Sequence, residues 1–247
     1  FFTNTNPDTN SYVNVNINST WANSSTTYGN YAFHTILHEI THGLGLGHGG
    51  PYNGNGFSYT DDAIFANDSW QTTAMSYWSQ GALGGHTHNT ANGNTSGCYL
   101  STLMVCDWIA LDDLYGAEAG VGVSTAFEGN TIYGFNTNIN SSTSGIFNEL
   151  KDWIPTTAFT IIDGSGDDTL DLSGFDNSTD IDLRASEKSA TTLNASNIAG
   201  KIGNLTIAAG TVIENAIGGG GNETITGNSA NNVITGSGGN DTIDGSG

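Results

Sequence analysis

The sequence predicts an α+β chain in which a mixed N-terminal domain precedes an all-β domain of parallel strands. Three observations carry this prediction. Helix-like spacing of apolar residues is confined to the first half of the 247 residues. Beyond about residue 118, short β-branched runs alternate with corners rich in Gly, Asp and Asn. Near the end, glycine and isoleucine both recur every nine residues. We therefore expect one domain over 1–117 and a second over 118–247.

Residues 12–17 alternate apolar and polar side chains, which predicts a strand with one buried face. A helix is expected over about 31–44, with its core face formed by Phe33, Ile36, Ile40 and Leu44. A second helix is expected over about 107–115, where one face carries Trp108, Leu111, Leu114 and Tyr115. We expect Asp107 to be its N-cap and Gly116 its C-terminal stop. Between the helices, residues 49–106 predict an ordered loop.

The composition limits the partners of this chain. It has 24 acidic and 4 basic residues, which gives a formal net charge of −20. Nucleic acid and anionic membranes both require basic patches, so neither is an expected partner. No run of residues approaches the roughly 20 apolar positions of a membrane span. The acidity favours either cation binding, with calcium as the expected ion, or solubility alone.

The first helix carries a metal-binding motif, His38-Glu39-Ile40-Thr41-His42-Gly43-Leu44-Gly45-Leu46-Gly47-His48. His38 and His42 are four residues apart, so they share one face of the helix and can bind one metal ion. Gly45 lets the helix end and the chain reverse, which brings His48 back as a third nitrogen ligand. The open fourth position is typical of catalytic zinc. Glu39 can then act as general base toward a water molecule.

Chance spacing of surface or core histidines is the alternative interpretation of this motif. HExxH alone is a weak signal, but the full string keeps five fixed positions and matches the HExxHxxGxxH pattern of the metzincins, which are zinc endopeptidases. That class also has a tight turn with a methionine beneath the zinc. Ala74-Met75-Ser76-Tyr77-Trp78 follows His48 by 27 residues and supplies Met75. The resemblance implies that Met75 forms an apolar floor under the imidazoles.

Further segments resemble the serralysins, which are secreted bacterial calcium-dependent metalloproteases. They are Ser76-Tyr77-Trp78, Gly49-Gly50-Pro51-Tyr52-Asn53, Asp112-Asp113-Leu114-Tyr115-Gly116-Ala117, Thr131-Ile132-Tyr133-Gly134-Phe135-Asn136 and Glu214-Asn215-Ala216-Ile217-Gly218-Gly219. The resemblance runs from about Tyr28 to the C-terminus and implies a metzincin-type zinc protease domain followed by an RTX β-roll. Serralysins have a longer segment before the zinc motif and a longer roll, so we expect both domains to be truncated here.

The resemblance also implies specific roles. One catalytic zinc ion would be bound by His38, His42 and His48, with Tyr77 as an extra ligand in the resting enzyme. Tyr77 would then swing away and help to stabilise the oxyanion. Protein or peptide substrates, a secreted and extracellular location, and a proteinaceous inhibitor as a candidate partner follow from the same resemblance.

The last thirty residues predict a parallel β-roll that binds calcium. Residues 218–226 fit the GGxGxDxUx nonapeptide with Glu223 for the acid, and residues 236–244 fit it with Ser at the second glycine. The copy at 227–235 lacks the acid. A Gly-rich linker is the alternative, but it would not keep a nine-residue period in both glycine and isoleucine. The expected calcium ligands of the roll are Gly219, Gly221, Glu223, Gly236, Gly238 and Asp241.

An earlier loop, Asp163-Gly164-Ser165-Gly166-Asp167-Asp168, is also calcium-like. The resemblance implies that Asp163 and Asp168 share an ion with the main-chain oxygens of Phe127 and Gly129. It further implies that Glu214 joins the first site of the roll. We therefore expect several structural calcium ions.

The remaining candidates leave alternatives open. Cys98 and Cys106 are eight residues apart; an extracellular setting would permit a disulfide, with metal binding as the rival interpretation. His34, His86 and His88 are interpreted as structural or surface residues. The chain could also be a non-catalytic calcium-binding protease remnant that acts as a binding module. The intact zinc motif favours the enzyme, and a casein assay with and without a zinc chelator would distinguish the two.

Overall fold

The computed structural model describes residue 15 and residues 27–79, 98–116, 122–190 and 192–246. Its helices are α2 (Tyr31–Gly43), α3 (Tyr59–Asp62), α4 (Val105–Tyr115), α5 (Gly145–Asn148), α6 (Leu150–Trp153) and the 3-10 helix η1 (Val123–Thr125). Its strands are β1 (Tyr99–Leu100), β2 (Ile132–Gly134), β3 (Thr157–Ile161), β4 (Thr169–Asp171), β5 (Asp180–Asp182), β6 (Leu205–Ile207), β7 (Asn215–Ile217), β8 (Thr224–Thr226), β9 (Val233–Thr235) and β10 (Thr242–Asp244). Apart from Val15, the predicted strand over 12–17 lies outside the described residues, and so do His86 and His88.

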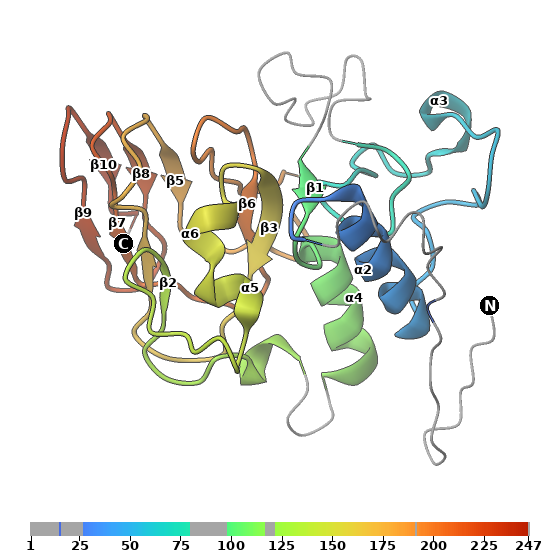
Figure 1. Cartoon of the computed structure of the whole chain (residues 1–247), viewed down its shortest axis with the longest axis horizontal. Coiled ribbons are helices and arrows are strands. Elements are labelled where there is room, and N and C mark those ends of the chain that lie inside the picture. The colour runs from blue at the N-terminus through green and yellow to red at the C-terminus, as the bar shows by residue number, and fades with distance from the viewer. Residues whose placement is uncertain (1–14, 16–26, 80–97, 117–121, 191, 247) are drawn as a thin grey trace.

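The C-terminal part is a parallel β-roll, as the nine-residue period predicts. Successive repeats alternate between two sheets, whose strand orders are β2-β4-β7-β9 and β10-β8-β5. Within each sheet the register links Asn215 to Val233 and Thr224 to Thr242, and both pairings are parallel. Each pairing therefore spans two nine-residue repeats, and the turns between repeats stack along the roll (Figure 1).

The isoleucines of the repeats divide between the two sheets. Ile225 is buried and lies in register between Ile181 and Ile243, which is 49% exposed on the edge strand β10. Ile234 pairs instead with Ala216 in the other sheet. The core of the roll is thus built from apolar side chains that both sheets contribute, and it continues into α5 and α6 through Phe147, Leu150 and Ile154.

A third sheet, in the order β1-β3-β6, connects the two halves of the chain. Tyr99 in β1 pairs with Thr157 in β3. Strand β1 precedes residue 118, whereas its sheet partners β3 and β6 follow that residue. This sheet therefore crosses the domain boundary predicted near residue 118, and that boundary stays a prediction. Figure 1 shows α2 and α4 beyond β1, on the side away from the roll. The C-terminal ends of these helices are joined by a hydrogen bond that the Tyr115 hydroxyl donates to the Leu44 carbonyl.

The helix predicted over 31–44 forms as α2, but its predicted core face is wrong. Ile40 is 45% exposed and Leu44 is 40% exposed, whereas the buried positions are Ala32, His34, His38 and Thr41. The face that carries histidines is turned inward because main-chain groups hold its rings. Nδ1 of His38 donates to the Ala74 carbonyl at 2.7 Å, and Nδ1 of His34 accepts from the Leu100 amide at 3.2 Å.

The second helix, α4, begins two residues earlier than predicted. Its N-cap is Met104, so Asp107 is the third helical residue and the prediction of Asp107 as N-cap is wrong. The Asp107 carboxylate still accepts a hydrogen bond from the Met104 amide at 2.9 Å. The helix ends at Gly116, as predicted. Leu111 is buried, whereas Leu114 and Tyr115 are exposed, so only part of the predicted apolar face is covered.

Cys98 and Cys106 do not form the disulfide that an extracellular setting would permit. Cys98 is buried directly before β1, whereas Cys106 is exposed in the first turn of α4. The two thiols therefore lie in different environments. Burial raises the pKa of the Cys98 thiol.

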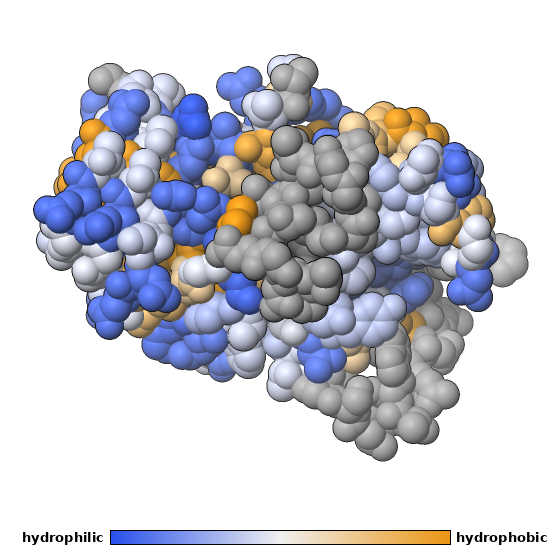
Figure 2. Space-filling model, turned by 90° about the horizontal axis from the view of Figure 1, so that it is seen from above, coloured by the Kyte–Doolittle hydropathy of each residue, from blue (hydrophilic) through white to orange (hydrophobic). Residues whose placement is uncertain are grey.

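Surface character agrees with the acidic composition. The roll, on the left of Figure 2, presents a mostly hydrophilic surface. Among the described helices, none combines the length and the apolar character that a membrane span requires.

Candidate metal centre

Helix α2 positions the first two histidines and then stops where the motif requires. The Asn30 side chain caps its start by accepting from the Ala32 amide at 2.9 Å. At the other end Gly45 has a φ of +101°, a conformation that a residue with a side chain adopts only with strain. The chain reverses there and returns His48 to the face that carries His38 and His42. The predicted reversal at Gly45 is confirmed.

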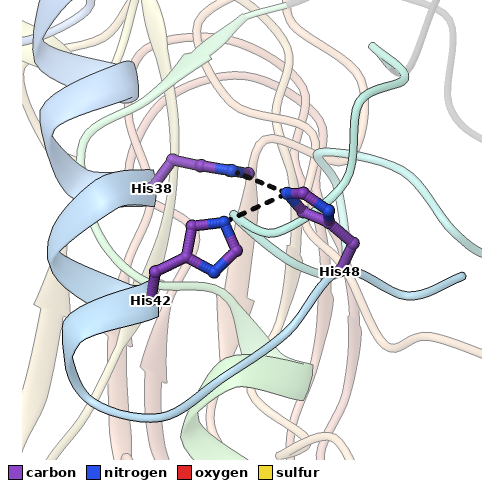
Figure 3. A group of neighbouring side chains, drawn as sticks. All are labelled: His38, His42 and His48. Carbon is purple, nitrogen blue, oxygen red and sulfur yellow. Dashed lines mark hydrogen bonds between the residues drawn. The ribbon is translucent and has the colours of Figure 1, made fainter. Parts of the chain in front are cut away.

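The structure places the three imidazoles around one point (Figure 3). Nε2 of His48 lies 3.1 Å from Nε2 of His38 and 3.1 Å from Nε2 of His42. The ligand atoms of this triad lie within 4.8 Å of one another, and it is the one cluster of this kind among the described histidines, cysteines and acids. Tetrahedral zinc with bonds of about 2.0–2.1 Å would hold its nitrogens roughly 3.3 Å apart.

Main-chain carbonyls fix the orientation of all three rings. Nδ1 of His38 lies 2.7 Å from the Ala74 carbonyl, Nδ1 of His42 lies 2.8 Å from that of Leu46, and Nδ1 of His48 lies 2.7 Å from that of Tyr52. Each Nδ1 must donate, so in the neutral rings each Nε2 carries a lone pair. Three lone pairs aimed at one another repel unless a cation lies between them.

Burial favours the neutral form of two of the imidazoles, those of His38 and His48. Desolvation lowers the pKa of His38, and the neighbouring His42 and His48 lower it further. Desolvation also lowers the pKa of His48. The carboxylate of Glu39 opposes both shifts, which places a negative charge close to the triad. Neutral imidazole is the form that binds metal, so the lowered pKa values of His38 and His48 favour metal binding at neutral pH.

Glu39 and Tyr77 line one cavity with His38. The cavity volume is about 370 Å³, and its other described lining residues are Tyr31, His34, Thr35, Gly54, Trp70 and Ser76. The Tyr77 ring centroid lies 4.5 Å from that of His48. Its hydroxyl accepts from the Gly54 amide at 3.2 Å and keeps its own proton for donation. The acid and the phenol predicted from sequence therefore share one pocket beside the triad.

The methionine turn acts through its main chain. Met75 is fully buried, and its neighbour Ala74 supplies the carbonyl that orients His38. Asp107 holds this turn in place. Its carboxylate accepts from the Ala74 amide at 2.7 Å and from the Thr73 hydroxyl at 2.6 Å. Sequence reasoning assigned Asp107 only to its own helix, because nothing in the chain order links it to residues more than thirty positions earlier.

Asp107 is buried among three donors, and its pKa is about 6 because burial raises it more than the hydrogen bonds lower it. The Asp107→Ala variant would leave the Thr73, Ala74 and Met104 donors without their acceptor. We expect it to lose about 3 kcal/mol of unfolding free energy, measured by denaturant titration. Asp113→Ala is the matched control, since Asp113 pairs with Lys188 on the surface, and we expect it to lose less than about 0.5 kcal/mol. Equal losses in both variants would contradict this role.

Tyr52 and Asp68 support the third histidine. The Tyr52 ring stacks on His48 with centroids 5.2 Å apart and an interplanar angle of 17°. Its hydroxyl donates to Asp68 at 2.9 Å and accepts from the Gly49 amide at 3.2 Å. Burial raises the pKa of this phenol, which stays protonated. Sequence reasoning missed both residues, although an aromatic side chain four residues after His48 was visible.

Two predicted calcium ligands, Asp163 and Asp168, lie in one buried cluster. The Tyr133 hydroxyl donates to Asp163 at 2.7 Å, and the Thr131 amide donates to Oδ1 of Asp168 at 2.7 Å. Oδ2 of Asp168 is buried and has no hydrogen-bond partner among the described residues. Burial, followed by the charges of Asp163 and Glu214, raises the pKa of Asp168 to about 7.

Phe127 and Gly129, the other residues expected at this site, lie close to the cluster, and so does Glu214, which was expected at the first site of the roll. Glu214 accepts from the Asp168 amide at 2.8 Å, so it lies beside the earlier loop as well as at the start of the roll. Phe127 and Gly129 both have positive φ, 45° and 91°. Gly129 pairs through its amide with the Ser165 carbonyl at 2.7 Å, which ties the two segments together.

In the roll, turns 218–223 and 236–241 stack on one another. The Gly238 amide donates to the Gly219 carbonyl at 2.9 Å, and the Glu223 amide donates to Asp241 at 2.9 Å. Both carboxylate oxygens of Glu223 are buried, and within the described part of the chain neither has a hydrogen-bond partner. Burial and the nearby Asp241 raise the pKa of Glu223. Of the remaining predicted ligands, Gly236 lies against the Asp241 carboxylate and Gly221 lies in the first of these turns.

Comparison with known proteins matches residues 123–242 to the family described as Peptidase M10 serralysin C terminal. Serralysin C from Dickeya chrysanthemi is 37% identical over 196 residues, which cover 79% of this chain and 36% of that protein. Metalloprotease AprA from Pseudomonas entomophila is 38% identical over 211 residues, or 85% of this chain and 39% of that protein. Serralysin from Proteus mirabilis is 38% identical over 208 residues, or 82% and 37%. The chain thus spans less than half the length of these relatives.

Proposed function

Because this chain is a serralysin-like protein, we propose that it is a secreted zinc-dependent endopeptidase that calcium stabilises. The observation that carries the proposal is the convergence of three imidazole Nε2 atoms beside Glu39. In this proposal residues 1–117 form a metzincin-type protease domain and residues 118–247 form the calcium-binding roll. The names of the relatives, serralysin and metalloprotease, support protein or peptide substrates.

The residues of the triad fit a zinc ion. The Nε2 atoms of His38 and His42 each lie 3.1 Å from that of His48, and a main-chain carbonyl holds each ring, which fits the ligand type and spacing of a catalytic zinc site. When bound, zinc would supply a Lewis acid that polarises a peptide carbonyl and makes water a nucleophile near neutral pH. Glu39 and Tyr77 then remain for proton transfer and for oxyanion binding.

Glu39 is the general base and Tyr77 the oxyanion donor in this proposal. The Glu39 carboxylate takes a proton from the attacking water and returns it to the amine that leaves. The Tyr77 hydroxyl, released from the Gly54 amide, donates to the oxygen that becomes negative. Asp107 and Tyr52 do not touch substrate. They position His38 and His48 through the carbonyls of Ala74 and Tyr52.

Calcium fits the carboxylates of the roll. A buried carboxylate oxygen without a partner is costly, and Asp168 and Glu223 together have three oxygens that no described residue contacts by a hydrogen bond. A hard cation that prefers carboxylate and carbonyl oxygens would compensate them. The calcium ligands that we propose are Phe127, Gly129, Asp163, Asp168, Glu214, Gly219, Gly221, Glu223, Gly236, Gly238 and Asp241.

The turn at 227–232 differs from these sites because side-chain amides close it. Oδ1 of Asn232 accepts from the Asn228 amide at 2.9 Å, and its Nδ2 donates to the Glu214 carbonyl and to Asn228 Oδ1, both at 2.9 Å. All three contacts are satisfied without an ion. This turn therefore needs no calcium.

The Asn232→Asp variant is expected to bind one more calcium ion per chain than the wild type. The substitution replaces the Nδ2 donor by an oxygen that faces the Glu214 carbonyl and Asn228 Oδ1, and a cation is needed between oxygens. Equilibrium dialysis with radioactive calcium would measure the count. Asn231→Asp is the matched control, because the neighbouring Asn231 is exposed and the charge change is the same. An unchanged count in Asn232→Asp would contradict this account of the turn.

A casein assay on the full chain tests the proposed enzyme. We expect hydrolysis that a zinc chelator abolishes and that added zinc restores, with one zinc ion per chain by elemental analysis. A chain that carries one zinc and several calcium ions but leaves casein and other polypeptides intact would instead support the non-catalytic binding module.

A further inference from the structure

The cavity beside the triad extends well beyond the reacting groups. Its lining residues on α2 are Tyr31, His34, Thr35, His38 and Glu39. Because residues three and four apart share one helix face, this lining runs along two turns of α2, from Glu39 back to Tyr31. A substrate that places its scissile bond beside Glu39 therefore also presents a neighbouring side chain to the Tyr31 end of the cavity.

His34 supplies one polar group to that end of the cavity. It is 3% exposed, and its Nδ1 accepts from the Leu100 amide at 3.2 Å. An acceptor Nδ1 in a neutral ring requires the proton to be on Nε2. Burial, followed by the charge of His38, lowers the pKa of His34 to about 3, so the ring is neutral at physiological pH. No hydrogen-bond partner of this Nε2–H is found among the described residues.

Aromatic rings surround this donor. The Trp70 ring centroid lies 4.5 Å from that of His34, and the Tyr31 ring stacks on His34 at 6.4 Å. Tyr99 lies 6.1 Å from His34 and 5.6 Å from Trp70. Such rings favour a flat aromatic side chain in offset or edge-to-face contact. The volume of about 370 Å³ has room for one.

We propose that His34 is a specificity-determining residue that selects substrates with a tyrosine next to the cleaved bond. This inference rests on the proposed peptidase function. The tyrosine ring packs against Trp70 and Tyr31, and its phenol oxygen accepts from Nε2–H of His34. A phenylalanine packs in the same way but covers the Nε2–H donor of His34 without offering it an acceptor. An acidic side chain is disfavoured by the Glu39 carboxylate in the same cavity.

Two peptides that differ only by tyrosine or phenylalanine at the position next to the cleaved bond test this proposal. We expect the wild type to favour tyrosine by about tenfold in kcat/KM, the worth of one such hydrogen bond. Mass spectrometry of the products verifies the cleaved bond. Equal kcat/KM values for the two peptides in the wild type would overturn the proposal.

Two variants separate the donor from the structural role of His34. His34→Asn keeps an acceptor for the Leu100 amide but is too short to offer the distal donor, so we expect the preference to fall to about one. His34→Gln carries an amide donor at the reach of Nε2, and we expect it to keep a clear preference for tyrosine. A His34→Asn protein with wild-type zinc content and an unchanged tenfold preference would also refute the assignment.

A binding measurement keeps this test independent of turnover. In Glu39→Gln, where hydrolysis is expected to be lost, quenching of tryptophan fluorescence would report binding through Trp70. We expect the tyrosine peptide to bind about tenfold more tightly than the phenylalanine peptide. If the wild type cleaves neither peptide but still binds the tyrosine peptide more tightly, the proposed peptidase function is refuted and the proposed tyrosine pocket is retained. If the wild type cleaves both peptides without any preference, only the proposed tyrosine pocket is refuted.

Discussion

The Glu39→Ala variant is expected to keep its zinc and to lose peptide hydrolysis. Glu39 lies in the cavity beside His38 but is outside the histidine triad, so its removal leaves the three nitrogens and their carbonyl partners in place. General base catalysis contributes about 10²- to 10⁴-fold to a rate. We therefore expect kcat/KM on a peptide substrate to fall by at least about 100-fold, with one zinc per chain by elemental analysis.

Two further variants make this result specific. His42→Ala removes a ligand and should lose both the zinc and the activity, whereas Asp113→Ala, an exposed acid on α4, should lose neither. Turnover of Glu39→Ala within about twofold of the wild type would refute the assignment of the base. Loss of zinc from Glu39→Ala would show that the carboxylate holds the site together and does not serve catalysis alone.

Removal of calcium is expected to lower the melting temperature by about 5–10 °C for each site that was saturated at roughly 100 times its Kd. A ligand at that concentration contributes about 2.7 kcal/mol, and about 1 kcal/mol shifts the melting temperature of a chain of this size by roughly 2–4 °C. The physical reason is that Asp168 and Glu223 have buried carboxylate oxygens that accept no hydrogen bond from the residues that the structure describes. Differential scanning calorimetry with and without a calcium-selective chelator measures the shift.

Glu223→Gln tests which carboxylate is responsible. It removes one charge from the stacked turns, so its melting temperature should respond less to the chelator, whereas Asp113→Ala should respond as the wild type does. Protons compete with calcium for Asp168, whose pKa is about 7, so calcium affinity should fall as the pH falls from 7 to 5. If the chelator leaves the melting temperature of the wild type unchanged, the proposal of calcium sites is contradicted.

The roll and the triad were accessible from sequence because both rest on local periodicity. A nine-residue period in glycine and isoleucine predicts stacked turns. In the structure, strands that are two repeats apart pair in parallel register. Histidines four residues apart on a helix share a face whatever surrounds them. Gly45 adds the reversal, since its backbone takes the positive φ that other residues avoid.

The orientation of α2 was not accessible in this way. Apolar periodicity predicted that Ile40 and Leu44 face the core, yet the structure buries His34 and His38 on the other face. Amphipathic patterning ranks side chains by their polarity alone. It does not include the main-chain hydrogen bonds that make the burial of an imidazole favourable, here those with the Ala74 carbonyl and the Leu100 amide.

The sequence by itself determined the repeat that winds the roll, the helix that pairs His38 with His42, and the glycine that returns His48. Each of these features depends on a local pattern of residues that are close together in the sequence. Only the tertiary structure decided that Asp107 holds the methionine turn, that Tyr52 and Asp68 support His48, and that His34 lies among aromatic rings. The contacts of Asp107 with Ala74, of Tyr52 with Asp68 and of His34 with Trp70 and Tyr99 join residues 16 to 65 positions apart. Such pairings follow from how the elements pack and not from any local pattern.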